Sequence, residues 1–365
     1  MISFLRQLIE RSPSNLITYS DYIGTVLYNP QYGYYMKEKQ KIGREGDFFT
    51  TSNVSDVFGR IMAKWFSQLI RRHQLPPVFC EIGAGNGRFA RAFLEEWKES
   101  VQTPLSYRIV EMSPYHRKLQ NELLQSDFDV EQYKSLLEVP SFEGILFSNE
   151  LFDALPVHVI EKVDGRLYEI MIGFKEGKLY EQRVPIENKA IQAFLKESGL
   201  HLGNKQRIEI PLSMHDMLKQ FAAVLTKGIV ITVDYGYSNE DWMEPAKKNG
   251  SLRGYYQHQM VENVLLHPGE MDITSHVHFD WLRQKGEECQ LEFVTQLRQD
   301  EFLLKAGILK ELADHYDPNP FSAVSKRNRA IRSLIMPSGM SSSFHVVAQQ
   351  KNMKLKTEKE LFENE

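Results

Sequence analysis

The feature that most constrains the fold is a glycine-rich turn between an apolar run and an amphipathic segment. The apolar run covers residues 78–80, and residues 89–97 place apolar side chains at helical spacing. This order predicts a strand, a tight turn and a helix. Gly83, Gly85 and Gly87 stand at every second position of the turn, so the backbone can curl tightly and a ligand can approach it closely. The first amides of the helix would point at that ligand.

The glycine spacing and a neighbouring acid indicate which ligand this is. The dinucleotide fingerprint needs its third glycine one residue later, where this chain has Arg88. Glu81 ends the predicted strand, and a carboxylate there would repel a pyrophosphate but suits the amino group of S-adenosylmethionine (SAM). The turn therefore favours SAM over NAD. For the motif alone, a glycine turn that serves only helix packing remains an alternative.

A second acid stands where doubly wound folds bind ribose. Residues 107–111 read as the second strand, which ends in Glu111, roughly 20 residues beyond the turn, where such folds place the carboxylate that accepts ribose hydroxyls. Further core strands are expected at residues 128–133, 144–148 and 228–233. The chain thus predicts an α/β fold with a Rossmann-like, mostly parallel doubly wound sheet.

Changes in this pattern divide the chain into parts. Hairpin signals at Asp164-Gly165 and Glu176-Gly177 indicate an antiparallel insertion. The expected parts are a helical N-terminal segment with a lid (1–75), the first part of the core (76–156), a β-hairpin and helical insertion (157–205), the second part of the core (206–350) with an irregular substrate loop (250–276), and a charged, fraying tail (351–365).

The composition excludes several classes of protein. A formal net charge of −4 over 365 residues lacks the basic excess of a general nucleic-acid binder. The two cysteines, Cys80 and Cys289, provide no disulfide framework and indicate a reducing compartment. No apolar stretch is long enough to span a bilayer. His276 and His278 lack a third ligand at suitable spacing, so we expect a cytoplasmic enzyme without a metal, a nucleic-acid partner or a membrane partner.

In its motifs the chain resembles the MidA-type SAM-dependent methyltransferases. The motifs are, in order, Asn29-Pro30-Gln31-Tyr32-Gly33-Tyr34-Tyr35, Gly46-Asp47-Phe48-Phe49-Thr50, the glycine turn, Asn149-Glu150-Leu151-Phe152-Asp153-Ala154-Leu155-Pro156, Asp234-Tyr235-Gly236, and Pro268-Gly269 with Asp272-Ile273-Thr274. The resemblance implies a class I methyltransferase core, SAM as the cofactor and a protein arginine as the methyl acceptor. Mitochondrial members act in respiratory complex I assembly, which implies a respiratory-complex subunit as partner and, for a eukaryotic source, the mitochondrial matrix. The oligomeric state does not follow.

The motifs and the resemblance together assign residues to the cofactor. The expected cofactor contacts are Gly46, Phe48, Glu81, Gly83, Gly85, Gly87, Glu111, Ser135, Leu136 and Asn149. Gly46 and Phe48 belong to an aromatic, irregular segment that we expect to close as a lid, although it can equally be a packed surface loop. The chain departs from the family pattern at Ser52-Asn53, Lys134 and His278. The change at Lys134 leaves the neighbouring residues 135 and 136 to hold the adenine, and the loss of an acid at Asn53 leaves open whether the substrate differs.

The catalytic residues are expected directly after the fourth strand. A guanidinium stays charged at neutral pH and requires carboxylates to bind its fork of N–H donors. Glu150 and Asp153 share one face if residues 151–155 form a helical turn, and the alternative is that one of them only caps that turn. A small-molecule methyltransferase and a non-catalytic SAM-binding assembly factor remain alternatives for the whole chain.

Overall fold

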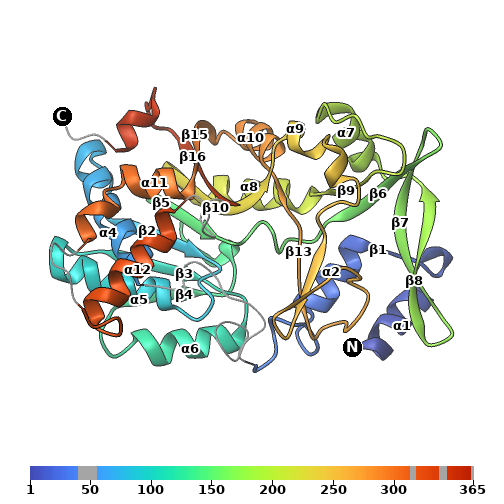
Figure 1. The fold of residues 1–365 in the computed structure, drawn as a ribbon, viewed down its shortest axis with the longest axis horizontal. Coiled ribbons are helices and arrows are strands. Elements are labelled where there is room, and N and C mark those ends of the chain that lie inside the picture. Colours follow the sequence, from blue (N-terminus) through green and yellow to red (C-terminus); the bar gives the residue numbers. More distant parts are fainter. Residues whose placement is uncertain (40–55, 313–317, 337–342, 363–365) are drawn as a thin grey trace.

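A mixed, mostly parallel sheet forms the centre of the molecule (Figure 1). The computed structural model describes residues 1–39, 56–312, 318–336 and 343–362. The strand order is β15–β16–β10–β5–β2–β3–β4, and β16 alone runs antiparallel to its neighbours on this path. The strands are β2 (Val78–Ile82), β3 (Ser106–Val110), β4 (Val130–Tyr133), β5 (Phe142–Asn149), β10 (Leu225–Tyr237), β15 (Glu292–Arg298) and β16 (Phe344–Lys351). The predicted α/β fold is confirmed.

The strand order reverses beside β2. The chain runs outward from β2 to β3 and β4 and then returns to β5, on the other side of β2. The carboxyl ends of β2 and β5 therefore meet at a topological switch point, and open α/β sheets bind ligands in the crevice outside such a point.

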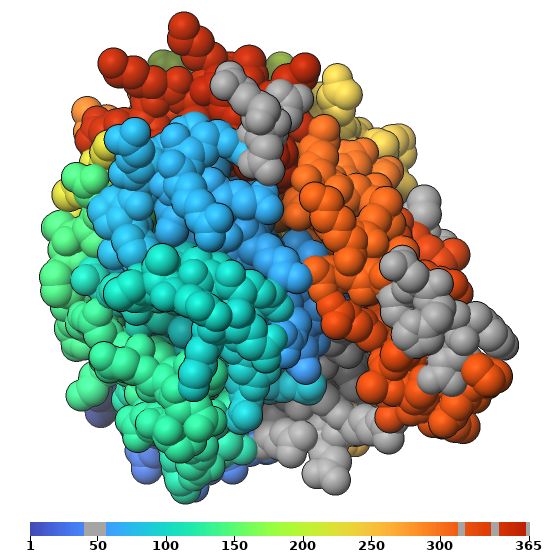
Figure 2. Space-filling view, turned by 90° about the vertical axis from the view of Figure 1, so that its left-hand side faces the viewer, coloured from blue at the N-terminus to red at the C-terminus, as the bar shows by residue number. Residues whose placement is uncertain are grey.

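Helices cover both faces of the sheet. One face packs against α4 (Val57–His73), α5 (Arg88–Glu96), α6 (Pro114–Leu124), α11 (Gln299–Lys305) and α12 (Ala323–Ile335), and the other against α7 (Lys189–Glu197), α8 (Leu212–Val224) and α10 (Phe279–Glu288). Successive residues of a strand point to opposite faces, so Phe79 of β2 lies in the first core and Cys80 in the second. Figure 2 shows the face of α4, α5 and α12.

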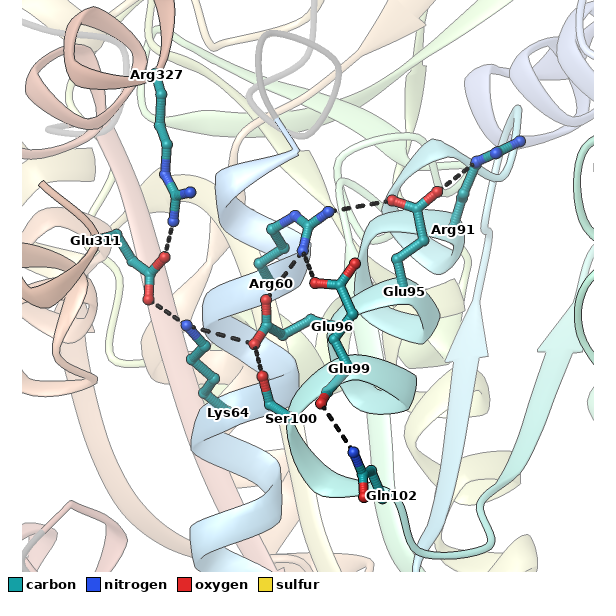
Figure 3. A network of polar contacts seen from close by, with 10 residues as sticks. All are labelled: Arg60, Lys64, Arg91, Glu95, Glu96, Glu99, Ser100, Gln102, Glu311 and Arg327. Atoms are coloured by element: carbon teal, nitrogen blue, oxygen red, sulfur yellow. Dashed lines mark hydrogen bonds and ion pairs between the residues drawn. The ribbon is translucent and has the colours of Figure 1, made fainter. Parts of the chain in front are cut away.

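A network of ion pairs ties the helices of the first face together (Figure 3). Arg60 of α4 contacts three glutamates, Glu95, Glu96 and Glu99, of α5 and the π-helical turn that follows it. On α4, Lys64 pairs with Glu96 and with Glu311, which also pairs with Arg327 of α12. Arg327 therefore links α12 to the other helices of this face.

The N-terminal segment and the insertion form a second lobe, at the right in Figure 1. Its five-stranded sheet contains β1 (Ile17–Thr18), β6 (His158–Val163), β7 (Arg166–Lys175), β8 (Lys178–Pro185) and β9 (Arg207–Ile210). α1 (Ile2–Arg11) and α2 (Tyr19–Tyr28) pack against it. Both hairpin turns have two successive residues of positive φ, as type I′ turns require. β9 pairs with β6, so this sheet extends beyond residue 205.

Two expectations about irregular chain are wrong. Residues 250–276 contain β11 (Arg253–Tyr256), β12 (Gln259–Val261) and β13 (Asp272–Thr274), an antiparallel sheet whose strands are too short to show alternation in the sequence. Beyond β16 the tail does not fray up to residue 362, because Leu355 and Leu361 are buried and Trp65 Nε1 donates a hydrogen bond to the Leu361 carbonyl (3.0 Å).

Two further short elements are α9 (Asn239–Trp242), which follows β10, and β14 (Val277–His278), which pairs with the end of β10. Within the described ranges, no helix combines the length and the apolarity needed to cross a bilayer.

Candidate functional site

A cavity of about 310 Å³ opens at the carboxyl ends of the central strands. Nine of the residues predicted for the site line it: Glu81, Gly83, Gly85, Glu111, Ser135, Leu136, Asn149, Glu150 and Asp153. Gly87 instead stands at the N-cap of α5, and Gly46 and Phe48 lie outside the described residues. The structure thus brings the expected cofactor and acceptor residues into one cavity at the switch point.

The glycine turn is held in a conformation that glycine adopts most easily. Gly83, Gly85 and Gly87 have φ of +75°, +53° and +81°, values that residues with a Cβ rarely adopt. The Gly85 amide donates a hydrogen bond to the Glu111 carboxylate (3.1 Å), and its carbonyl accepts one from Gln120 Nε2 (2.7 Å). The turn is therefore fastened to β3 and α6, with its backbone against the cavity.

Two buried acids lie beside this turn. Glu81 is 4% exposed and accepts a hydrogen bond from the Tyr107 hydroxyl (2.7 Å), and burial raises its pKa to about 8. Glu111 also accepts a hydrogen bond from the amide of Ser113 (2.8 Å), the residue that caps α6. Asn149 Oδ1 is buried and has no hydrogen-bond partner among the described residues. These groups fit a ligand that carries a cation and hydroxyl donors, such as SAM.

A second group of acids lies past the end of β5. Glu150 has a φ of +53° and lines the cavity, and the Asn149 side chain donates a hydrogen bond to its carboxylate (3.1 Å). A left-handed non-glycine residue costs free energy and often marks a functional position. Asp153 accepts a hydrogen bond from the Tyr235 hydroxyl through Oδ2 (2.5 Å), whereas its buried Oδ1 has no partner within the described ranges.

The expected helical turn after β5 is absent. Residues 150–155 form an irregular turn instead, because Glu150 is left-handed and Asp234 of β10 accepts hydrogen bonds from the amides of Phe152 (2.9 Å) and Asp153 (3.3 Å). The capping role considered for the two site acids therefore belongs to Asp234. Both site acids face the same cavity, although by a different geometry from the predicted one.

The acids of this group share an unusual electrostatic environment. Burial, followed by the charge of Asp153, raises the pKa of Glu150 to about 8, and burial raises the pKa of Asp234 to about 8. Burial and Asp234 hold the pKa of Asp153 well above its usual value. Lys134 and His116 are the basic side chains that line the cavity, and Lys134 adjoins Ser135 and Leu136, expected to hold the adenine. The acidic end therefore suits a cationic ligand.

Several cavity residues were not predicted. Tyr28, Tyr35 and Asp272 come from the second lobe and from β13, and Met217 and Gln220 come from α8. Tyr35 and Asp272 stand in motifs noted in the sequence, so the sequence could have indicated them as site residues. Nothing in the sequence indicated Met217 and Gln220, because only the packing of distant segments brings α8 to the cavity.

The two histidines considered as a metal pair are packed between aromatic rings. His276 stacks on Tyr237 and His278 on Trp242, with ring centroids 4.3 Å and 4.4 Å apart. Burial lowers their pKa values to about 4 and about 3, so both are neutral at neutral pH. Among the described residues, no group of three or more His, Cys, Asp and Glu side chains is placed to hold a metal ion.

Comparison with known proteins gives a family match and relatives that are all described as methyltransferases. Residues 58–296 match a family described as "Putative S-adenosyl-L-methionine-dependent methyltransferase". "Protein arginine methyltransferase NDUFAF7, mitochondrial" of Homo sapiens is 25% identical over 333 residues, which cover 82% of this chain and 72% of that protein. The Drosophila melanogaster protein named as its homolog is 28% identical over 302 residues, covering 74% and 67%.

Solved structures are similar over nearly the whole chain, and we describe one of them. It is a Burkholderia thailandensis protein bound to S-adenosyl-homocysteine (SAH), with a TM-score of 0.87 and 26% identity, and the match covers 97% of this chain and 92% of that one. The similarity extends beyond the sheet to the second lobe, since both chains match almost completely.

Proposed function

The chain belongs to this family of SAM-dependent methyltransferases, and we propose that it methylates the guanidinium group of an arginine in a protein. The enzyme class and the cofactor were both predicted from the sequence, and both are confirmed. The observation that carries the acceptor assignment is the pair Glu150 and Asp153, which faces the cavity; among the described residues, neither acid forms an ion pair with a lysine or arginine side chain. The names of the relatives support the same acceptor.

We assign one end of the cavity to the cofactor. Bound SAM supplies an electrophilic methyl group on a sulfonium, so the protein has to supply position rather than reactivity. Glu81 would hold the amino group and Glu111 the ribose hydroxyls, while Ser135 and Leu136 would border the adenine. The positive φ angles of the glycine turn leave room for the ligand against the backbone.

The acidic end would bind and orient the acceptor. A guanidinium presents N–H donors in a planar fork, and the unpartnered Oδ1 of Asp153 is an acceptor for one of them. Glu150 would accept a second donor, and the cation would lower its pKa from about 8 so that it ionises. Transfer would form a bond between the guanidinium nitrogen and the methyl carbon and break the bond from that carbon to sulfur, so that SAH leaves with the bonding electron pair. The nitrogen must then lose a proton, and Glu150 is the group that we assign to receive it.

Transfer of labelled methyl groups tests this function. The purified enzyme and methyl-tritiated SAM are added to lysate from cells that lack the gene, and to the small-molecule extract of the same lysate. Label should enter protein and be recovered as methylarginine after acid hydrolysis. Label in the extract alone would indicate a small-molecule methyltransferase, and label in neither fraction would indicate a binding protein without transfer activity.

The partner and the compartment stay predictions. A respiratory-complex subunit follows only from the family resemblance, and the relatives are named as mitochondrial proteins. For this chain we expect the cytoplasm, or the mitochondrial matrix if the source is a eukaryote. Identification of the labelled protein by mass spectrometry tests the partner directly.

A further inference from the structure

We infer that Tyr35 and Asp272 determine acceptor specificity, by giving the cavity an aromatic and anionic wall that selects a planar cation. This inference rests on the proposed function, because it concerns the acceptor end of the same cavity. It assigns a role to the Asn29–Tyr35 and Asp272–Thr274 motifs, which the cofactor residues and the two acids after β5 do not explain.

The wall joins two segments that lie far apart in the sequence. The Tyr35 hydroxyl donates a hydrogen bond to Asp272 Oδ1 (2.6 Å), and both residues line the cavity. Asp272, the first residue of β13, is 3% exposed. The Tyr28 ring stacks on the Tyr35 ring with 5.5 Å between centroids and 26° between planes. The Tyr28 hydroxyl donates to the Ala154 carbonyl (2.8 Å), next to Asp153.

The backbone of Tyr35 is fixed on two sides. Its amide donates to the Leu27 carbonyl at the end of α2 (3.0 Å), and its carbonyl accepts a hydrogen bond from the Ser113 hydroxyl (2.6 Å). Ser113 also donates its amide to Glu111, an acid at the cofactor end. Tyr35 thus stands between the cofactor end and the acceptor end, and its ring is placed before either ligand binds.

The preceding turn is built for this close approach. A Cβ on Gly33 would lie 2.6 Å from the Asn29 amide nitrogen and 2.7 Å from the Leu27 carbonyl oxygen. Asn29 Oδ1 accepts hydrogen bonds from the amides of Gln31 and Tyr32 (3.0 Å each). The chain therefore reverses tightly after α2 and returns Tyr35 to the cavity.

This arrangement suits a guanidinium better than an ammonium ion. A guanidinium is planar, stacks on aromatic rings and donates in several directions within its plane, whereas a lysine ammonium is compact and strongly hydrated. Glu150 and Asp153 follow β5, and Asp272 comes from β13. Carboxylates from two elements beside an aromatic ring match the donors and the face of a planar cation.

Binding of two small probes to the full-length protein loaded with SAH tests the inference. N-acetyl-arginine amide and N-acetyl-lysine amide are titrated by NMR into wild type, Asp272→Asn and Tyr35→Phe. Asp272→Asn should raise the dissociation constant of the arginine probe roughly tenfold or more, because a charge-assisted hydrogen bond is lost. Tyr35→Phe, which keeps the ring, should reduce the preference for arginine over lysine. SAH affinity should stay within twofold of wild type for both variants.

Tyr22→Phe and Glu150→Gln are the controls. Tyr22 is buried in the same lobe and donates to the Val264 carbonyl (2.7 Å), outside the cavity, so its variant loses a comparable hydrogen bond without touching the wall. Equal weakening of the arginine probe in Tyr22→Phe and Tyr35→Phe would overturn the inference. Wild-type binding in Asp272→Asn and Tyr35→Phe, together with loss in Glu150→Gln, would overturn it and leave the proposed function intact. A wild-type protein with no arginine preference and no transfer to protein would overturn both.

Discussion

Replacing Glu150 by glutamine should make the protein more stable and less active at the same time. The pKa of Glu150 is raised from 4.5 to about 8, so the native state binds this proton more tightly than the unfolded chain does. The free energy of unfolding therefore decreases as the pH rises from 4.5 through 8, because the unfolded chain ionises this carboxyl more easily than the native state does. A neutral glutamine of the same shape removes this loss and leaves the rest of the cavity in place.

The magnitude follows from the shift. Each pKa unit corresponds to about 1.4 kcal/mol, so the full shift from 4.5 to about 8 gives about 5 kcal/mol as an upper bound. Glu150 is half-buried and faces the cavity, where water screens its charge, so we expect about 1–3 kcal/mol in the free energy of unfolding at pH 9. At pH 5 the two proteins should differ by less than about 1 kcal/mol, since the wild-type carboxyl is then protonated.

Urea unfolding at pH 5, 7 and 9 measures this difference without ligand. The same preparations should transfer methyl groups to the labelled acceptor at least roughly 10-fold more slowly for Glu150→Gln, because a charge-assisted contact worth about 1.5–3 kcal/mol is lost. SAH affinity from calorimetry should be unchanged. A variant that is no more stable than wild type at pH 9 would refute the electrostatic reasoning. Full transfer by both Glu150→Gln and Asp153→Asn would refute the acceptor role.

Three further outcomes test the cofactor end. Gly85→Val should abolish SAM binding in calorimetry while leaving the circular dichroism spectrum unchanged, because Gly85 has a positive φ and borders the cavity; normal binding would contradict the assignment. At pH 7, SAM binding should release a proton, because the free Glu81 carboxyl has a pKa of about 8 and a bound cation favours its ionised form. Calorimetry in two buffers of different ionisation enthalpy measures the release, and an equal release from Glu81→Gln would exclude Glu81 as its source. Hydrogen exchange over residues 40–55, which lie outside the described ranges, should slow when SAM binds, and unchanged exchange would argue against the predicted lid.

The core could be predicted because its signals are local. β2, the glycine turn and α5 follow one another within residues 78–96, and each has its own pattern of apolar residues or glycines. β5 and β10 are buried on both faces and read as continuous apolar runs. Most of the nine predicted residues that line the cavity follow from the same pattern, because strand ends of a doubly wound sheet meet at one edge. Ser135 and Leu136 were assigned through the family resemblance.

The features that the sequence did not predict depend on contacts between segments that are distant in the sequence. Asp234 accepts hydrogen bonds from the amides of Phe152 and Asp153, which lie 82 and 81 residues away in the sequence. No local sequence pattern predicts such a bond. The strands within residues 250–276 have three or four residues each, fewer than alternation needs to be visible. In the tail, Leu355 and Leu361 stand among charged residues, and their burial depends on the first core, which they join, rather than on their neighbours in the sequence.

The two ends of the cavity differ in how they are built, and this difference bears on function. The cofactor end uses the strand ends and the glycine turn, whereas the acceptor end adds Tyr28, Tyr35 and Asp272 from outside the core sheet. The half-buried Glu150 and the buried Asp153 reduce the free energy of unfolding in the absence of a cation. A bound cation neutralises these acids and offsets their destabilising effect, but only while it is bound. The acceptor's binding free energy therefore comes mainly from its charged, reacting group. We therefore expect changes in the wall of Tyr35 and Asp272 to alter the choice of acceptor while SAH affinity stays near that of wild type. The stability gained and the activity lost in Glu150→Gln should both come from the one carboxylate.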